Sequence, residues 1–295
     1  MRFGIVILPQ RSWREARADW MGAEAYGFDH AWTYDHLSWR TLAAEPWHAT
    51  IPTLTAAAAV TSRIRLGTFV SSPNFRHPVP FAKEIATVDD VSSGRFVLGV
   101  GSGGTGFDAV TLGQDAYTPG QRHERFAEFV ADLDVLLRHE SPGSEGISFD
   151  GDWFTAVNAR MVGTPAQQPR VPFVVAANGP KGLGLVTRFG AGWATTGKDG
   201  TDGEAWWSSV RGLVNQLEDA AHAAGRDPLS IDRSLSLDSG GSYSVQSLGA
   251  FETAVGRAAE LGFTDVISHW PRPQGVYAGD RNILDQIAGR LDGLR

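Results

Sequence analysis

The feature that most constrains the fold of this chain is a regular alternation between short apolar runs and longer amphipathic stretches. Short apolar runs bounded by turn residues predict strands, and apolar residues at helical spacing predict helices. The predicted strands are residues 2–8, 28–34, 64–70, 95–100, 172–176, 191–196, 231–238 and 263–269. The predicted helices are residues 12–26, 47–61, 79–91, 121–138, 180–189, 204–224, 247–261 and 280–293. Strict alternation implies parallel strands with right-handed crossovers, in either a closed barrel or an open, doubly wound sheet.

One segment, between Glu140 and Arg170, breaks the alternation. The sequence SPGSEG followed by ISFDGDWFTAV indicates a turn and then a short hairpin around Asp150-Gly151-Asp152. This segment is too short to form a domain. We therefore expect a single domain of residues 1–295 with a short insertion at about 140–170, after the fourth predicted helix.

The composition excludes several classes of function. A formal net charge of -7 argues against binding to nucleic acid, which favours clustered basic residues. The absence of cysteine excludes disulfides, thiolate nucleophiles and cysteine metal sites, and no histidine pair has the helical spacing of a zinc motif. No apolar stretch approaches the roughly 18 residues of a membrane span, and MRFGIVILPQRSW reads as a strand and not as a secretory signal. We expect a soluble, cytoplasmic protein without a metal that binds a small molecule.

Residues 99–104, GVGSGG, match the glycine pattern of dinucleotide-binding proteins. That fingerprint belongs after the first strand of a Rossmann sheet and opens a helix at once. Here it follows the fourth predicted strand and leads into TGFDAVTLGQDAYTPG, which we interpret as a loop. The glycines therefore indicate a flexible turn or a backbone that a flat ligand can approach closely.

Several polar residues follow predicted strands, where an α/β barrel carries its active site. His36 follows the second strand in WTYDHLSW, beside Asp35, which could orient its ring or cap a turn. His269 holds the equivalent position after the eighth strand, as a rim residue or a substrate contact. Lys198 in TTGKDGT could reach an anionic substrate group or could simply be solvated.

Residues 176–182, AANGPKG, end the fifth predicted strand and begin a helix. The free amides and the dipole of a helix N-terminus can bind phosphate without a charged side chain, although an ordinary strand-to-helix junction has the same sequence pattern. Of the ten tryptophans, Trp32, Trp39 and Trp270 fall at or near the ends of predicted strands. Such residues suit an aromatic pocket wall, and core packing explains Trp32 equally well.

In their order along the chain, these motifs resemble the luciferase-like family of flavin- and deazaflavin-dependent oxidoreductases. The similar stretches lie within residues 31–193 and read AWTYDHLSW, TSRIRLGT, GTFVSSPNFRHP, ATVDDVSSGRFVLGVGSGG, PGQRHERFAEF and AANGPKGLGLVTRFGAGW. The family's fold is a (β/α)₈ TIM barrel, so the resemblance implies the closed arrangement. The subgroup that uses the deazaflavin coenzyme F420, which includes sugar-6-phosphate dehydrogenases, is the most similar.

The resemblance also implies roles for individual residues. His36 would be the catalytic acid–base residue. The coenzyme would contact Asp35, the wall formed by Phe69 and Val70 with a non-proline cis peptide bond, Ser102, Gly103, and the backbone amides of Ala177, Asn178 and Gly179. The substrate would contact Trp39, Lys198 and His269.

The chain departs from the sugar-phosphate dehydrogenases at the position of their second catalytic acid, where it has Gly104 in place of glutamate. Their tryptophan lies four residues after the histidine, whereas Trp39 lies three after His36. The resemblance therefore implies F420-dependent hydride transfer to or from a small organic substrate, and these departures argue against a sugar phosphate as that substrate. An FMN-dependent monooxygenase is the first alternative, and a barrel that binds a cofactor without turnover is the second. The family resemblance also implies a homodimer.

Overall fold

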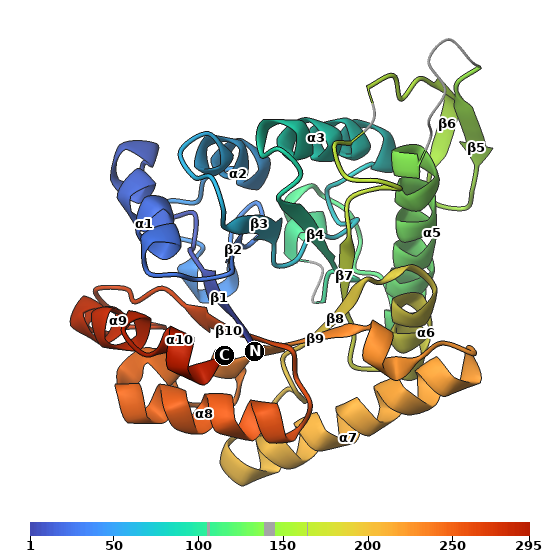
Figure 1. Cartoon of the computed structure of the whole chain (residues 1–295). Helices are drawn as coiled ribbons and strands as arrows, with labels where there is room; N and C mark the ends of the chain where they lie inside the picture. The colour runs from blue at the N-terminus through green and yellow to red at the C-terminus, as the bar shows by residue number, and fades with distance from the viewer. Residues whose placement is uncertain (105–106, 139–144, 164) are drawn as a thin grey trace.

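Eight parallel strands close into a barrel in the computed structural model, which describes residues 1–104, 107–138, 145–163 and 165–295 (Figure 1). The barrel strands are β1 (Arg2–Val6), β2 (His30–Thr33), β3 (Arg65–Thr68), β4 (Phe96–Val100), β7 (Phe173–Ala176), β8 (Gly192–Thr195), β9 (Asp232–Ser236) and β10 (Asp265–His269). Pairing of β1 with β10, from Arg2 opposite Asp265 to Val6 opposite His269, closes the barrel. All eight predicted strands are confirmed, and the closed arrangement replaces the open sheet.

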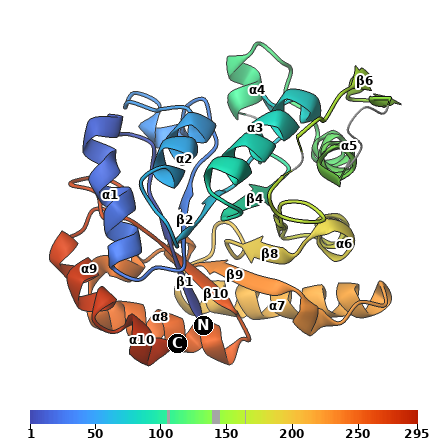
Figure 2. The same ribbon diagram turned by 45° about the horizontal axis from the view of Figure 1, so that its top comes forward.

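The helices surround the barrel on its outside (Figure 2). They are α1 (Trp13–Ala25), α2 (Thr50–Ala58), α3 (Pro78–Val91), α5 (Pro119–Arg138), α6 (Pro180–Phe189), α7 (Gly203–Ala223), α8 (Leu248–Glu260), α9 (Arg281–Ala288) and α10 (Leu291–Leu294), with 3₁₀ turns η1 (Arg40–Leu42), η2 (Pro228–Ser230), η3 (Leu237–Ser239) and η4 (Ser244–Gln246). The last predicted helix is split in two, because α9 ends where Gly289 caps it. No helix within the described ranges has both the length and the apolar character needed to cross a bilayer.

The segment between α5 and β7 contains the predicted hairpin, β5 (Ile147–Asp150) and β6 (Thr155–Ala159), which pair antiparallel beside α5 (Figure 1). The carboxylate of Glu128 on α5 accepts the backbone N–H groups of Trp153 and Phe154 at 3.0 and 2.7 Å, which ties the hairpin to the barrel. Most of the predicted SPGSEG turn lies outside the described residues.

The segment after β4 differs from the expected loop, because it contains a short helix, α4 (Phe107–Thr111). With five residues, α4 is too short for a helical repeat of apolar positions to appear in the sequence. Asp108 and Ala109 are the buried residues of this helix, at 1% and 2% exposure, so a polar side chain takes part in holding it.

The N-terminal end of the barrel interior is filled by a polar cluster of His30, Trp32, Asp265 and Arg2. His30 donates from Nε2 to Asp265 and accepts at Nδ1 from the indole N–H of Trp32. Arg2 donates to both oxygens of Asp265, at 2.8 and 2.6 Å. Gly4 is required beside this cluster, because a Cβ there would lie 2.2 Å from the ring of His30. This packing fills the N-terminal end of the interior, and the active sites of such barrels lie at the opposite, C-terminal end.

Burial alone would raise the pKa of Asp265, but hydrogen bonds from His30 and Arg2 outweigh it and hold the pKa well below its ordinary value. The replacement Asp265→Asn should therefore lower the free energy of unfolding by about 3 kcal/mol, because it removes one partner of a buried ion pair. Urea unfolding followed by circular dichroism measures this loss. The matched control is Asp292→Asn, at a fully exposed carboxylate that faces Arg295; it should leave the unfolding midpoint unchanged.

The contribution of Asp265 to the free energy of unfolding depends on pH. Since the folded pKa of Asp265 is lower than the unfolded one, its ionised form stabilises the fold above the unfolded pKa of about 3.9. That contribution is lost as the pH falls toward the folded pKa. The difference in unfolding free energy between wild type and Asp265→Asn should therefore narrow below about pH 4. A difference that stays constant there would show that the carboxylate charge contributes nothing.

Candidate active site

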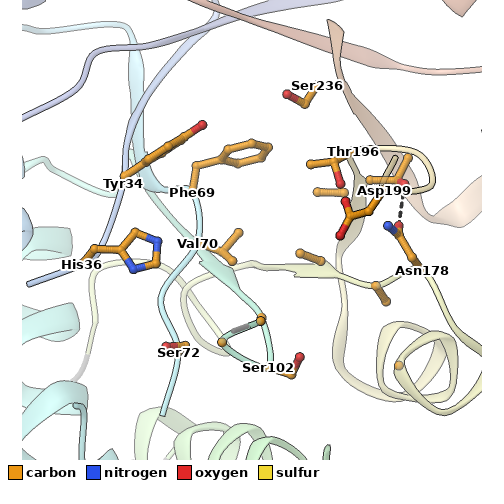
Figure 3. Close-up of a pocket in the computed structure, with 18 of the residues that line it drawn as sticks. Tyr34, His36, Phe69, Val70, Ser72, Ser102, Asn178, Thr196, Asp199 and Ser236 are labelled. Carbon is orange, nitrogen blue, oxygen red and sulfur yellow. Dashed lines mark hydrogen bonds between the residues drawn. The ribbon is translucent and has the colours of Figure 1, made fainter. Parts of the chain in front are cut away.

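A cavity of about 560 Å³ opens at the C-terminal ends of the strands (Figure 3). Its walls come from the segments that follow β2, β3, β4, β7, β8, β9 and β10. Because parallel strands in a barrel all end at the same face, residues far apart in the sequence meet there. The volume falls within the roughly 300–1,000 Å³ of small-molecule pockets.

His36 lines this cavity and is oriented by Asp108 on α4. The Nδ1 atom of His36 lies 2.7 Å from Asp108 Oδ2, and the backbone N–H of Leu37 donates to Asp108 Oδ1 at 2.8 Å. An ionised carboxylate only accepts hydrogen bonds, so Nδ1 of His36 carries the proton and Nε2 is left with its lone pair. The ring of Trp39 packs on His36 at a centroid distance of 4.4 Å.

Asp35, beside His36 in the sequence, has a different position from the one expected. Both of its carboxylate oxygens accept hydrogen bonds from Arg76, at 2.7 and 3.0 Å, and the side chain is buried at 1% exposure. Asp35 does not orient His36 and is not among the residues that line the cavity. Its role here is to hold Arg76, which also pairs with Glu84.

One wall of the cavity is formed by Phe69 and Val70, which are joined by a cis peptide bond as the resemblance implied. The segment after β4 packs closely against this wall. A Cβ at Gly101 would lie 2.7 Å from Val70 Cγ2. Gly103 has a φ of 75°, and a Cβ there would lie 2.4 Å from the side chain of Asn74. Three of the four glycines of GVGSGG, at 99, 101 and 103, thus serve close packing beside a pocket, whereas a Cβ at Gly104 would meet no atom within 4 Å.

The start of α6 forms another side of the cavity. Gly179 is the N-cap residue and Pro180 the first helical residue, so the free helical amides belong to Lys181 and Gly182, and the N–H of Leu183 already donates to Gly179 O. A Cβ at Gly179 would meet no atom within 4 Å, so the space beside it is open. The side chain of Asn178 is already engaged, since it donates to Gly197 O and accepts from Thr195 Oγ1. The backbone of Ala177 is engaged as well, with Ala194 O and the indole N–H of Trp193, so the backbone from Asn178 onward is the part that can bind a ligand.

Residues 1–238 match the family model described as Luciferase-like monooxygenase. The chain belongs to this family. The F420-dependent hydroxymycolic acid dehydrogenase of Mycobacterium tuberculosis is 33% identical over 299 aligned residues, which cover 96% of this chain and 73% of that protein. The F420-dependent glucose-6-phosphate dehydrogenase of Microbacterium testaceum is 32% identical over 218 residues, which cover 71% of this chain and 59% of that protein. This chain thus spans less than two thirds of the second relative.

Among solved structures, an F420-dependent secondary alcohol dehydrogenase in complex with an F420–acetone adduct superposes with a TM-score of 0.82. The sequence identity is 19%, and the match covers 100% of this chain and 99% of that one. At this identity the similarity concerns the fold, and it confirms the luciferase-like barrel.

Most of the residues predicted from the family resemblance meet in the cavity. Its lining includes His36, Trp39, Phe69, Val70, Ser102, Gly103, Ala177, Asn178 and Gly179. Lys198 does not line it, because the chain turns at Gly197 and the backbone N–H of Lys198 donates to Ser209 on α7; Asp199 takes its place. His269 is buried at 1% exposure, and Tyr34 and Tyr277 contact it and line the cavity.

Sequence reasoning missed Asp108, Tyr34, Asp199, Ser236 and Tyr277 as site residues. Tyr34 and Asp199 adjoin residues that we did single out, and their positions after strands could have indicated them. Nothing in the sequence pattern points to Asp108, which lies in a segment we took for a loop. Within the described ranges, no three histidine, aspartate or glutamate side chains are arranged to hold a metal ion.

If Asp108 fixes the segment after β2, Asp108→Ala should speed hydrogen exchange at the Leu37 amide by about tenfold, since it removes a hydrogen bond to a charged group. Exchange measured by NMR tests this. Asp115→Ala, at an exposed residue of the same segment, is the control and should leave Leu37 unaffected. Equal protection of Leu37 in all three proteins would mean that Asp108 does not hold His36 in place.

Proposed function

We propose that this chain is an oxidoreductase that uses coenzyme F420 to transfer a hydride to or from a small organic substrate. One observation carries the proposal: a single cavity combines a carboxylate-oriented histidine, a cis-peptide wall and an open helix N-terminus. The F420-dependent relatives support the choice of coenzyme. When bound, the deazaflavin supplies a ring carbon that accepts or releases the hydride.

The residues present fit such a coenzyme. Phe69, Val70, Ser102 and Gly103 offer a narrow wall of apolar side chains and backbone for a flat ring. The backbone amides of residues 178–179 and the first amides of α6 offer donors to a phosphate group, whereas the expected donor at Ala177 is already bonded to Ala194 O. His123 also lines the cavity, and its pKa is lowered by burial and by the nearby Lys181 ammonium. The positive charge at the start of α6 favours an anionic group there.

His36 handles the proton that accompanies hydride transfer. With Nδ1–H held by Asp108, Nε2 can take a proton from a substrate hydroxyl or return it to a carbonyl oxygen. Trp39 packs against this ring and limits its motion, and it forms part of the substrate side of the cavity. General acid–base catalysis of this kind contributes about 10²–10⁴-fold to rate. The replacement His36→Ala should reduce turnover by that order.

An FMN-dependent monooxygenase is the second candidate, and the description of the matching family model as a monooxygenase favours it. Titration of the protein separately with F420 and with FMN, followed by fluorescence, distinguishes the two. Bound F420 whose absorption changes with a primary or secondary alcohol, such as 2-propanol, is the expected result. Tight binding of FMN without affinity for F420 would overturn the proposal, and binding of neither would favour a barrel without turnover.

The proposed phosphate-binding segment at Gly179 can be tested separately. The replacement Gly179→Val should weaken F420 binding at least about tenfold, because the new side chain fills the open space where backbone donors meet the phosphate. The matched control is Gly184→Val on α6, where a Cβ also meets no atom within 4 Å and which does not line the cavity. Isothermal titration measures both affinities, and thermal unfolding checks that both proteins are folded. Equal affinities would remove this segment from the coenzyme site.

A homodimer and a cytoplasmic location remain predictions from the family resemblance and the sequence. Sedimentation equilibrium tests the first, and a monomer mass at working concentration would contradict it. Cell fractionation tests the second.

A further inference from the structure

A second imidazole–carboxylate pair lies beside the cavity. His269, the last residue of β10, donates from its backbone N–H to Asp238 Oδ2 at 2.7 Å, and its Nδ1 lies 2.8 Å from the same oxygen. On the other side of the ring, Nε2 lies 2.8 Å from the hydroxyl of Tyr34. The side chains of His269 and Asp238 are almost fully buried. Asp238, His269 and Tyr34 thus form one continuous chain of hydrogen bonds.

Hydrogen-bond chemistry fixes where the protons lie in this chain. The carboxylate of Asp238 can only accept, so Nδ1 of neutral His269 carries a proton. Nε2 then has a lone pair and accepts the O–H of Tyr34. The Tyr34 oxygen keeps its own lone pairs, and the hydroxyl of Tyr277 is 3.4 Å away. The arrangement is that of a Ser-His-Asp triad, in which a carboxylate orients an imidazole base, with a phenol in place of the serine hydroxyl.

The chain of hydrogen bonds reaches the cavity only through tyrosines. Tyr34 and Tyr277 line the cavity, whereas His269 and Asp238 do not. The hydroxyl end of Tyr34 points away from the imidazole of His36 in Figure 3. The ring centroids of Tyr34 and His36 are 6.2 Å apart, and His36 has its own carboxylate partner, Asp108. The two imidazoles therefore serve different positions in the same cavity.

We infer that Tyr34 is a second proton-transfer residue of the site, with His269 and Asp238 as its positioning residues. The inference rests on the proposed function. When the reacting hydroxyl of a substrate lies at Tyr34 Oη and not at Nε2 of His36, the hydroxyl loses its proton to Tyr34 Oη, the proton of Tyr34 passes to Nε2 of His269, and the imidazolium formed is held by the Asp238 carboxylate. The substrate's C–O bond becomes C=O as its hydride leaves to the coenzyme. The same steps in reverse protonate a carbonyl oxygen that has received a hydride.

The surroundings of Tyr34 suit a relay. Burial raises the pKa of Tyr34 well above its ordinary value, and Tyr277 and Asp238 add to this. The phenol is therefore neutral near pH 7 and passes on a proton only as another arrives. The charged and titratable groups that face this cluster are Asp238 from η3, Tyr243 beside η4, Tyr277 and Arg272 from the segment after β10, and Arg40 from η1.

A purely structural role of Tyr34 can be distinguished from proton transfer, because a second tyrosine of the cluster serves as a matched control. Tyr243 donates its hydroxyl to the backbone oxygen of His269 at 2.8 Å and does not line the cavity. If the cluster only fixes the segments after β9 and β10, Tyr34→Phe and Tyr243→Phe should behave alike. If Tyr34 transfers protons, only Tyr34→Phe should change proton handling.

The first arm of the test needs no coenzyme. Ring ¹⁵N NMR of histidine-labelled protein at about pH 8 should show His269 protonated at Nδ1 only. Tyr34→Phe should move the Nε2 resonance, and Tyr243→Phe should leave it in place. A proton on Nε2, or an Nε2 resonance that does not respond to Tyr34→Phe, would overturn the relay.

The second arm uses the F420-loaded protein and the primary or secondary alcohol that changes the absorption of bound F420 most. Tyr34→Phe should lower kcat by about 100-fold with KM within about threefold, and should remove one limb of the pH–rate profile. His269→Gln should do the same, and Tyr243→Phe should keep the wild-type rate and profile. A Tyr34→Phe protein with wild-type rate and profile would contradict the inference. If no alcohol changes the coenzyme in any variant, the proposed function fails, and the first arm alone decides whether the relay exists.

Discussion

Closure of the sheet between β1 and β10 is the constraint on which the rest of this structure depends. Once the first and last strands pair, all eight strand ends point to one face, and every loop that follows a strand must meet the others there. The N-terminal half of the interior is filled by His30, Trp32 and Asp265. The large cavity of the described residues accordingly lies at the other end. That is why residues as distant in sequence as His36 and Tyr277 share one pocket.

Buried carboxylates are the second element of the design. Asp35, Asp108, Asp238 and Asp265 are all largely inaccessible to water, and each is paired with a guanidinium or an imidazole. Burying a charge without such a partner would cost several kcal/mol, so each pair fixes the relative position of two segments. Two of the pairs, Asp35 with Arg76 and Asp265 with Arg2, stabilise the fold. The other two present an imidazole, directly or through a phenol, to the cavity.

The strands, the helices and most of the pocket could be predicted from the sequence, because apolar periodicity reports burial and a residue after a barrel strand must lie at the rim. The direction of a loop side chain is not encoded in that pattern. Asp35 and Lys198 stand at the right place in the sequence, but Arg76 holds the first, and the backbone of the second is bonded to Ser209 on α7 after a turn at Gly197. Asp108 could not be predicted, because its contact with His36 depends on a helix of five residues. Such a helix is too short to give a repeat of apolar positions in the sequence.

The same limit applies to charge. A net charge of -7 would suggest that an anionic coenzyme is disfavoured, yet the net value averages over the whole surface. At the start of α6 the free helix amides and the Lys181 ammonium are positive, and burial together with this ammonium lowers the pKa of His123, which lines the cavity. Fields decay within about 8–10 Å in physiological salt, so these nearby groups, and not distant surface carboxylates, determine what the pocket attracts. An acidic chain can therefore carry a site that favours anions.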